Sequence, residues 1–86
     1  MFLEIVTPDE KFFEGEVESA TFPGIDGSFQ ILNNHAPLIS TLGTGDVHFW
    51  RMVEKKRRDT SILVEGGVVE VLNNKVTVLA EKILSE

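Results

Sequence analysis

The segment Pro23–Leu42, PGIDGSFQILNNHAPLISTL, is the part of the chain in which glycine, proline, asparagine and histidine surround a short apolar strand. Gly24 and Gly27 can adopt positive φ at turn positions without steric cost. After them, Phe29 and Ile31 alternate with polar residues, a period of two that is typical of a β-strand. The segment therefore predicts a turn that leads into a short strand.

A second loop follows this strand. Asn33 and Asn34 end the strand, because asparagine favours turns. Pro37 then restricts Ala36 to an extended conformation. His35 stands between them and is the residue type that titrates nearest to neutral pH. We expect the whole segment to form a shaped, loop-rich surface on a β scaffold.

The bulk properties indicate one folded domain, residues 1–86, with one modest core. An apolar fraction of 42% with 26% charged residues is ordinary for a globular protein, and the absence of cysteine excludes disulfides and thiolate metal sites. The net charge of −6 disfavours nucleic acid as a partner, because its phosphates require a basic surface. No apolar run approaches the roughly 20 residues that span a bilayer, and the amino terminus lacks a basic region typical of an export signal. We expect contact with a membrane only through a partner.

The flanking sequence consists of short strands separated by turn signals. The expected strands are Phe2–Thr7, a strand from Phe13 to Ser19, Val47–Glu54, Thr60–Glu65, Val68–Leu72 and Lys75–Lys82. The expected turns and breaks are Pro8–Lys11, Gly43–Asp46, Lys55–Asp59, a bend or bulge at Gly66–Gly67 and a hairpin at Asn73–Asn74. Evenly spaced short strands without a helical period predict an all-β fold, an antiparallel β-sandwich or flattened barrel.

The histidines do not form a catalytic or metal-binding pattern. His35 and His48 are 13 residues apart, and neither belongs to a spacing typical of metal ligands. A surface contact or a hydrogen bond that orders the loop is therefore the expected role of His35. Gly43–Gly45 lacks the Gly-Lys-Ser/Thr that completes a phosphate-binding loop. We expect no active site, no metal and no cofactor.

Two further groups of charged residues have simple structural explanations. Glu14, Glu16 and Glu18 share one face of a strand, which is the pattern of a solvated face. The basic run Lys55–Arg58 is typical of a solvated hairpin tip that discourages aggregation. Its functional alternative is attraction to an anionic surface, either lipid headgroups or an acidic subunit.

Three large apolar residues are candidates for interface anchors or for the core. They are Phe22, Trp50 and Met52. Aromatic residues dominate both interfaces and cores, so the sequence leaves both roles open.

Four segments together resemble the epsilon subunit of the F-type ATP synthase, specifically its amino-terminal β-sandwich domain. They are LEIVTPDEKFFEGEVES from Leu3, GSFQILNNHAPLISTL from Gly27, GDVHF from Gly45 and VEGGVVEVLNNKVTVLAE from Val64. They occur in the order and spacing of the family and extend from Leu3 to Glu81.

The resemblance implies a non-catalytic subunit of the rotor stalk, which turns with the gamma subunit and the membrane c-ring as its partners. It further implies a peripheral location at the cytoplasmic face of the bacterial inner membrane. The positions implied to face the c-ring are Ile25, Asp26, Gly27 and Ser28. The positions implied to lie at the contact with gamma and the ring are Asn34, His35, Ala36, Pro37 and Leu38.

The chain departs from the family pattern in three places. Ser28 stands where the family often has an acid, Gln30 where it has glycine, and Asn33–Asn34 where it has Pro-Gly. Bacterial members usually continue after Leu79–Glu81 into a helical hairpin that can restrain ATP hydrolysis, and in some members this hairpin binds ATP. The resemblance therefore implies a short form without that helical domain.

Two other interpretations compete with the rotor subunit. An acidic all-β unit of this length with Lys55 or Lys56 at a hairpin tip is similar to a lipoyl- or biotinyl-type carrier domain, although the motif around the lysine is missing. The third interpretation is a free-standing β-sandwich that binds an unassigned ligand.

Overall fold

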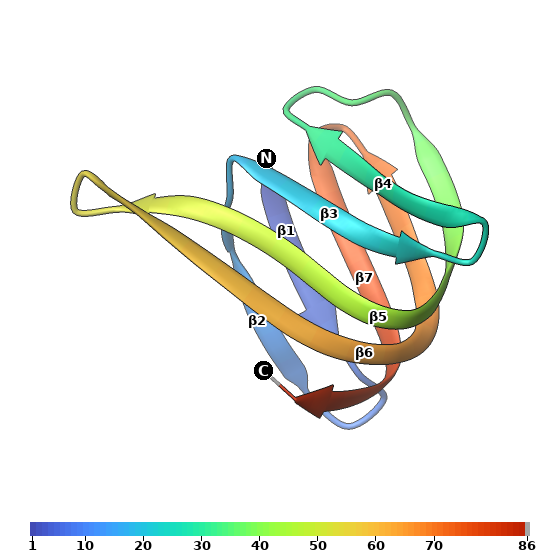
Figure 1. Cartoon of the computed structure of the whole chain (residues 1–86). Helices are drawn as coiled ribbons and strands as arrows, with labels where there is room; N and C mark the ends of the chain where they lie inside the picture. Colours follow the sequence, from blue (N-terminus) through green and yellow to red (C-terminus); the bar gives the residue numbers. More distant parts are fainter. Residues whose placement is uncertain (86) are drawn as a thin grey trace.

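The computed structural model describes residues 1–85 as seven β-strands and their connections (Figure 1). The strands are β1 (Phe2–Val6), β2 (Lys11–Glu16), β3 (Ser19–Gly24), β4 (Gly27–Leu32), β5 (Leu38–Val53), β6 (Lys56–Leu72) and β7 (Lys75–Ser85). The expected all-β class is confirmed.

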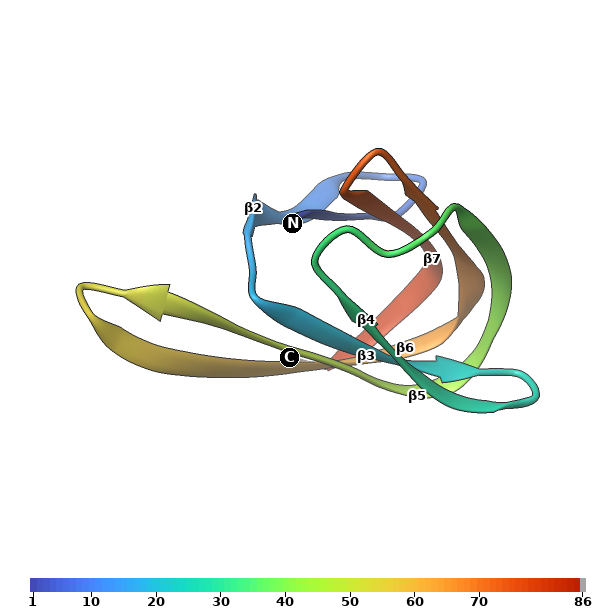
Figure 2. The same cartoon turned by 90° about the horizontal axis from the view of Figure 1, so that it is seen from above.

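All seven strands belong to one sheet with the order β2-β1-β7-β6-β5-β3-β4. Seen from above, the sheet curls so that β1 and β2 lie across the interior from β3 and β4 (Figure 2). Every neighbouring pair is antiparallel except β1 and β7, which are parallel. The parallel pair was not predicted, because the period-two pattern of a strand carries no information about the direction of its neighbour.

Two consecutive glycines of β6 stand where the sequence predicts a bend or bulge, and both have the positive φ that glycine permits. Gly66 and Gly67 have φ of +71° and +142°, values that side chains disfavour. A Cβ on Gly67 would overlap the carbonyl oxygen of Leu79 and lie 3.0 Å from the Cα of Ala80. Glycine is therefore required here by both the backbone conformation and the close approach of β7.

The predicted turn at Gly43–Asp46 is wrong, since these residues continue β5 in register with β6. Gly45 permits a close approach of β3, whereas Gly43 has only ordinary contacts. A Cβ on Gly45 would lie 2.7 Å from the Cβ of Pro23 in β3, and a Cβ on Gly43 would lie 3.9 Å from the carbonyl oxygen of Pro23. Glycine inside a strand often marks such a contact with another segment.

The core is apolar and is lined by both layers of the curled sheet. Its largest fully buried side chains are Phe22 and Phe49. The role of Phe22 as an exposed anchor is therefore wrong: it is fully buried and its ring centroid lies 5.6 Å from that of Phe29. Trp50 is half-buried, and Met52 remains 51% exposed.

Of the two hairpins predicted in the second half, the one at Asn73–Asn74 is confirmed and the other turns earlier than predicted. Asn73 and Asn74 have φ of +50° and +61°, as a two-residue hairpin turn requires. Glu54 and Lys55 have φ of +51° and +66° and form the turn between β5 and β6. The predicted break at Lys55–Asp59 is therefore only partly right, because most of the basic run belongs to β6.

Glu4 joins three neighbouring strands by ion pairs. Its carboxylate in β1 lies 3.1 Å from Nζ of Lys11 in β2 and 3.7 Å from Nζ of Lys75 in β7. The hydrogen bond and charge of Lys11, with the charge of Lys75, lower the pKa of Glu4 below its ordinary value of 4.5. A carboxylate with a lowered folded-state pKa stabilises the fold above its unfolded pKa, and this contribution is lost as the pH falls through the folded value.

We expect the wild-type chain to lose stability between about pH 5 and pH 3 more steeply than Glu4→Gln, because the amide cannot be protonated in this range. Urea unfolding at several pH values measures this difference. A matched variant, Glu70→Gln, removes a carboxyl group for which no ion pair is formed within residues 1–85. If Glu4→Gln and wild type lost stability in parallel, the role assigned to Glu4 would be wrong.

Candidate partner-binding surface

The first predicted interface segment, Ile25–Ser28, forms the tip of the β3–β4 hairpin. Gly24 pairs with Gly27, and a Cβ on Gly24 would lie 2.5 Å from the carbonyl oxygen of Gly27, so the hairpin closes tightly. The tip itself is exposed, and Ile25 is 66% accessible. The backbone N–H of Ile25 donates to the carbonyl of Thr41 at 3.1 Å, which ties the tip to β5.

The second predicted segment, Asn34–Leu38, forms most of the β4–β5 loop and the first residue of β5. Its side chains are exposed except Leu38, which is half-buried and packs against the core. The N–H of Asn34 donates to Oδ1 of Asn74 at 2.8 Å, and φ of Asn34 is +61°. Nδ1 of His35 donates to the carbonyl of Ala36 at 2.7 Å.

The loop is held by two distant parts of the chain. The side chain of Asn33 accepts a hydrogen bond from the amino terminus of Met1, and the β6–β7 turn supplies Asn74. These contacts order an exposed loop that has little core contact of its own. The hydrogen bond of His35 matches the loop-ordering role expected from the sequence.

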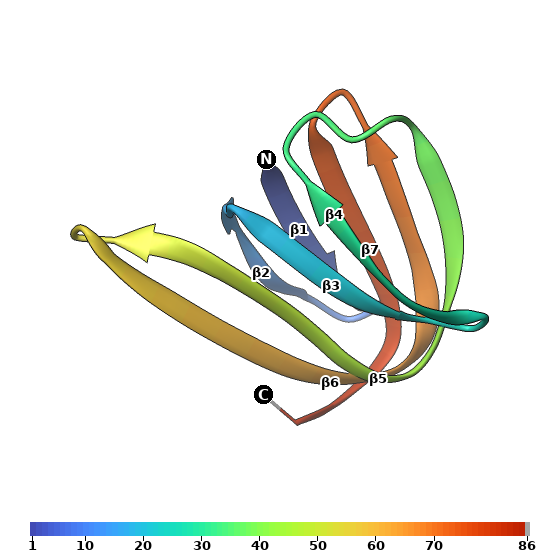
Figure 3. The same ribbon diagram turned by 45° about the horizontal axis from the view of Figure 1, so that its top comes forward.

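The structure does not bring the two segments together. β4 separates the hairpin tip from the loop, so they lie at opposite ends of this strand (Figures 1 and 3). A six-residue strand is about 20 Å long. The candidate residues therefore form two contact points on one edge of the molecule. A backbone hydrogen bond holds the hairpin tip, and hydrogen bonds through the side chains of Asn33 and Asn74 hold the loop.

The outer face of the sheet has an apolar patch that is not among the predicted contact residues. It consists of Ile39, Val68 and Leu79, which are 70%, 40% and 50% exposed. They line a shallow depression together with Glu70 and Thr77. The sequence contains a signal for this patch. Val68 directly precedes a buried valine and Leu79 directly follows one, so each breaks the apolar-polar alternation of a half-solvated strand.

The other candidate residues take simple structural roles. Glu14, Glu16 and Glu18 are exposed, as predicted for a solvated face. His48 hydrogen-bonds Asp59 at 3.1 Å, so the two histidines have different partners. Within residues 1–85, no three His, Asp or Glu side chains are placed to hold a metal ion. Within residues 1–85, no helix is long and apolar enough to cross a bilayer.

The whole chain, residues 1–86, matches the family described as ATP synthase, Delta/Epsilon chain, beta-sandwich domain. The chain belongs to this family. The resemblance seen in its motifs is thereby confirmed.

Relatives in the delta/epsilon family include proteins of different length. An ATP synthase epsilon chain of Maridesulfovibrio salexigens is 48% identical over 81 residues, which are 94% of this chain and 54% of the relative. The ATP synthase epsilon chain of Chlorobium limicola is 44% identical over 94% of this chain and 89% of its own length. The chain thus spans about half of one relative and most of the other.

Solved structures support the fold of this family member. A chain in the central stalk and c-ring structure of the Tetrahymena thermophila mitochondrial ATP synthase has a TM-score of 0.78 at 19% identity, over 98% of this chain and 65% of that chain. A chain in the Euglena gracilis mitochondrial ATP synthase has a TM-score of 0.81 at 19% identity, over 96% and 51%. At 19% sequence identity, these structural similarities show the fold alone.

Proposed function

We propose that this chain is a non-catalytic subunit of the central rotor stalk of a proton-translocating F-type ATP synthase. It couples rotation of the c-ring to the gamma subunit and the catalytic head. The observation that carries the proposal is the match of the entire chain to the delta/epsilon β-sandwich domain, with relatives named ATP synthase epsilon chain.

The architecture suits a mechanical role. Transmission of torque requires a body that does not deform, and close-packed interiors have low compressibility. The curled sheet encloses a continuous apolar core, and each of its strands is hydrogen-bonded to the next across the whole sheet, from β2 at one edge to β4 at the other. Its exposed hairpin tip and loop are attached to that body by hydrogen bonds to β5 and to the side chain of Asn74.

The exposed segments supply the contacts in this proposal. The hairpin tip Ile25–Ser28 faces the polar loops of the c-ring, and the loop Asn34–Leu38 contacts gamma and the ring. The apolar patch Ile39, Val68 and Leu79 begins directly after this loop and suits burial against a protein, because interface centres are more apolar than their rims. The subunit reaches the cytoplasmic face of the bacterial inner membrane only through these partners.

Site-directed cross-linking tests the proposed contacts. The chain has no cysteine, so Ser28→Cys and His35→Cys each introduce one unique thiol at an exposed position. Asp9→Cys, in the exposed β1–β2 turn, is the matched control. In the assembled complex we expect cross-links to the c-ring or gamma from the first two positions and not from the third. Equal products from all three would contradict the assignment of the surface.

His35→Ala is expected to weaken assembly with gamma and the c-ring by about 1–3 kcal/mol, as for an interface residue. The isolated domain should keep its stability, because the His35 side chain is exposed and its hydrogen bond is to the adjacent residue. Pull-down titration measures assembly, and urea unfolding of the isolated chain is the control. Unfolding of the isolated variant would make the histidine structural.

The carrier-domain interpretation is not favoured by the comparisons. Its lysine would be Lys55 in the β5–β6 turn or Lys56, the first residue of β6. An intact-mass measurement after expression with a lipoyl ligase distinguishes the two functions, since only a carrier domain gains the mass of the lipoyl group.

A further inference from the structure

The β5–β6 hairpin extends beyond the body as a two-stranded ribbon (Figures 1 and 2). β3 pairs with β5 only as far as Trp50, so residues 51–53 and 56–58 pair only with each other among the described residues. Residues 51–59 contain five lysines and arginines and two acids, within a chain of net charge −6. The ribbon is therefore a basic projection on an acidic protein.

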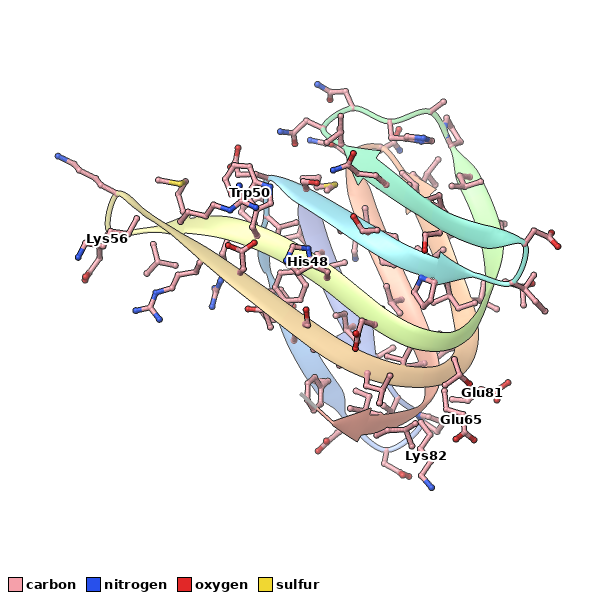
Figure 4. The ribbon with its side chains drawn as sticks, in the orientation of Figure 1. His48, Trp50, Lys56, Glu65, Glu81 and Lys82 are labelled. Carbon is pink, nitrogen blue, oxygen red and sulfur yellow. The ribbon has the colours of Figure 1, made fainter. Side chains whose placement is uncertain are left out.

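One face of the ribbon neutralises its own charge. Arg57 lies 4.5 Å from the ring centroid of Trp50 and forms two hydrogen bonds of 3.0 Å with Asp59. Asp59 also bonds His48. Figure 4 shows His48 and Trp50 where the hairpin leaves the body, and Lys56 toward its far end. This face has the partners that its charges require.

The opposite face has unpaired positive charge. Arg51 and Arg58 are directly opposite in the ladder, so their side chains share one face, and like charges at such positions repel. Neither forms an ion pair with the described residues, and Nε of Arg51 is buried without a hydrogen-bond partner. A buried donor without an acceptor is unfavourable.

Arg51 is half-buried and packs against β2. Its guanidinium lies 5.2 Å from the ring centroid of Phe13, and Nη1 lies 3.9 Å from the position of a Cβ on Gly15, both in β2. The depression beside these arginines is lined by Arg51, Val53, Arg58 and Thr60 of this face. It is also lined by Asp59, whose carboxylate binds Arg57 and His48 on the other face. We name this depression the arginine recess.

The shape of the arginine recess selects among anionic partners. A flat lipid bilayer can contact the outermost cations of the ribbon, but its headgroups cannot enter the depression to contact Arg51. A carboxylate side chain can enter, and guanidinium groups bind carboxylates with two parallel hydrogen bonds. We propose that the arginine recess binds a glutamate or aspartate side chain of an acidic protein segment. This proposal is independent of the rotor function.

Fluorescence anisotropy with a labelled peptide of alternating glutamate and serine tests the proposal on the full chain at low salt. The control peptide has glutamine in place of glutamate. The test variant is Arg51→Gln/Arg58→Gln, and the matched variant is Lys55→Gln/Lys56→Gln, which removes the same charge from the same ribbon outside the recess. We expect the arginine pair to weaken peptide binding about tenfold or more and the lysine pair less than about threefold.

The single variant Arg58→Gln is included in case the double arginine variant misfolds, because Arg58 is exposed. This single variant should weaken peptide binding by more than the lysine pair does. Equal losses in the two double variants would overturn the proposal, because binding would then follow net charge. Binding of the glutamine peptide would overturn it as well. Inorganic phosphate that displaces the peptide at equal concentration, or arginine-dependent binding to phosphatidylglycerol vesicles without peptide binding, would assign the recess to phosphate or lipid instead.

Discussion

Gly67→Ala is expected to lower the free energy of unfolding by at least about 3 kcal/mol, which for a domain of this size lowers Tm by roughly 12–24 °C. The added Cβ would overlap the Leu79 carbonyl oxygen and press on the Cα of Ala80, and both are backbone atoms of β7. The φ of +142° adds strain for any side chain. The two strands would have to separate where the sheet bends.

Gly66→Ala is the matched control for this prediction. Its φ of +71° is left-handed, but the Cβ would meet only the carboxylate of Glu81, the flexible end of an exposed side chain. A cost of about 1 kcal/mol is expected. Thermal unfolding of both variants by circular dichroism gives the comparison. If the two alanine variants had the same stability, the close approach of β7 to Gly67 would not limit the fold.

Phe49→Ala is expected to destabilise the isolated domain by about 3–5 kcal/mol, through lost burial and a cavity that the sheet cannot close. Phe49 is fully buried in β5, and its ring centroid lies 4.6 Å from that of Phe13 in β2. These strands belong to opposite layers of the curled sheet, so the pair connects the layers across the core.

Ile39→Ala is the control in the same strand, because it removes a large apolar side chain that is 70% exposed. Urea unfolding should show a change below about 1 kcal/mol for this variant. The two substitutions are expected to affect different properties: Phe49→Ala lowers the stability of the fold, whereas Ile39→Ala weakens binding to the rotor partners and leaves the fold stable. A loss of stability at Ile39 similar to that at Phe49 would contradict the assignment of Ile39 to the surface.

The fold class could be predicted because strand periodicity and turn residues are local properties. The asparagine hairpin and the Gly66–Gly67 bend follow from the conformational preferences of those residues alone. The strand assignment of Gly43–Asp46 could not be predicted, because it depends on Pro23 lying against Gly45 in the folded state. The parallel pairing of β1 with β7 joins the two ends of the chain and likewise has no local signal.

The candidate site was predictable in part for the same reason. The exposure of Ile25–Ser28 and Asn34–Pro37 follows from their turn composition, and the structure agrees. The apolar patch needed the register of three strands, since Ile39 meets Val68 and Leu79 only through the β5–β6 and β6–β7 ladders. The arginine recess needed the side-chain position of Arg51 against β2, which no sequence pattern indicates.

The measurement that tests the rotor proposal most directly is co-purification of the tagged chain with the gamma subunit and c-ring of its own organism. The proposal predicts a stable complex that contains all three components and that Ile39→Ala and His35→Ala weaken. A stable, monodisperse monomer that binds neither partner would contradict the proposal and would leave the chain as a β-sandwich binding module of another kind.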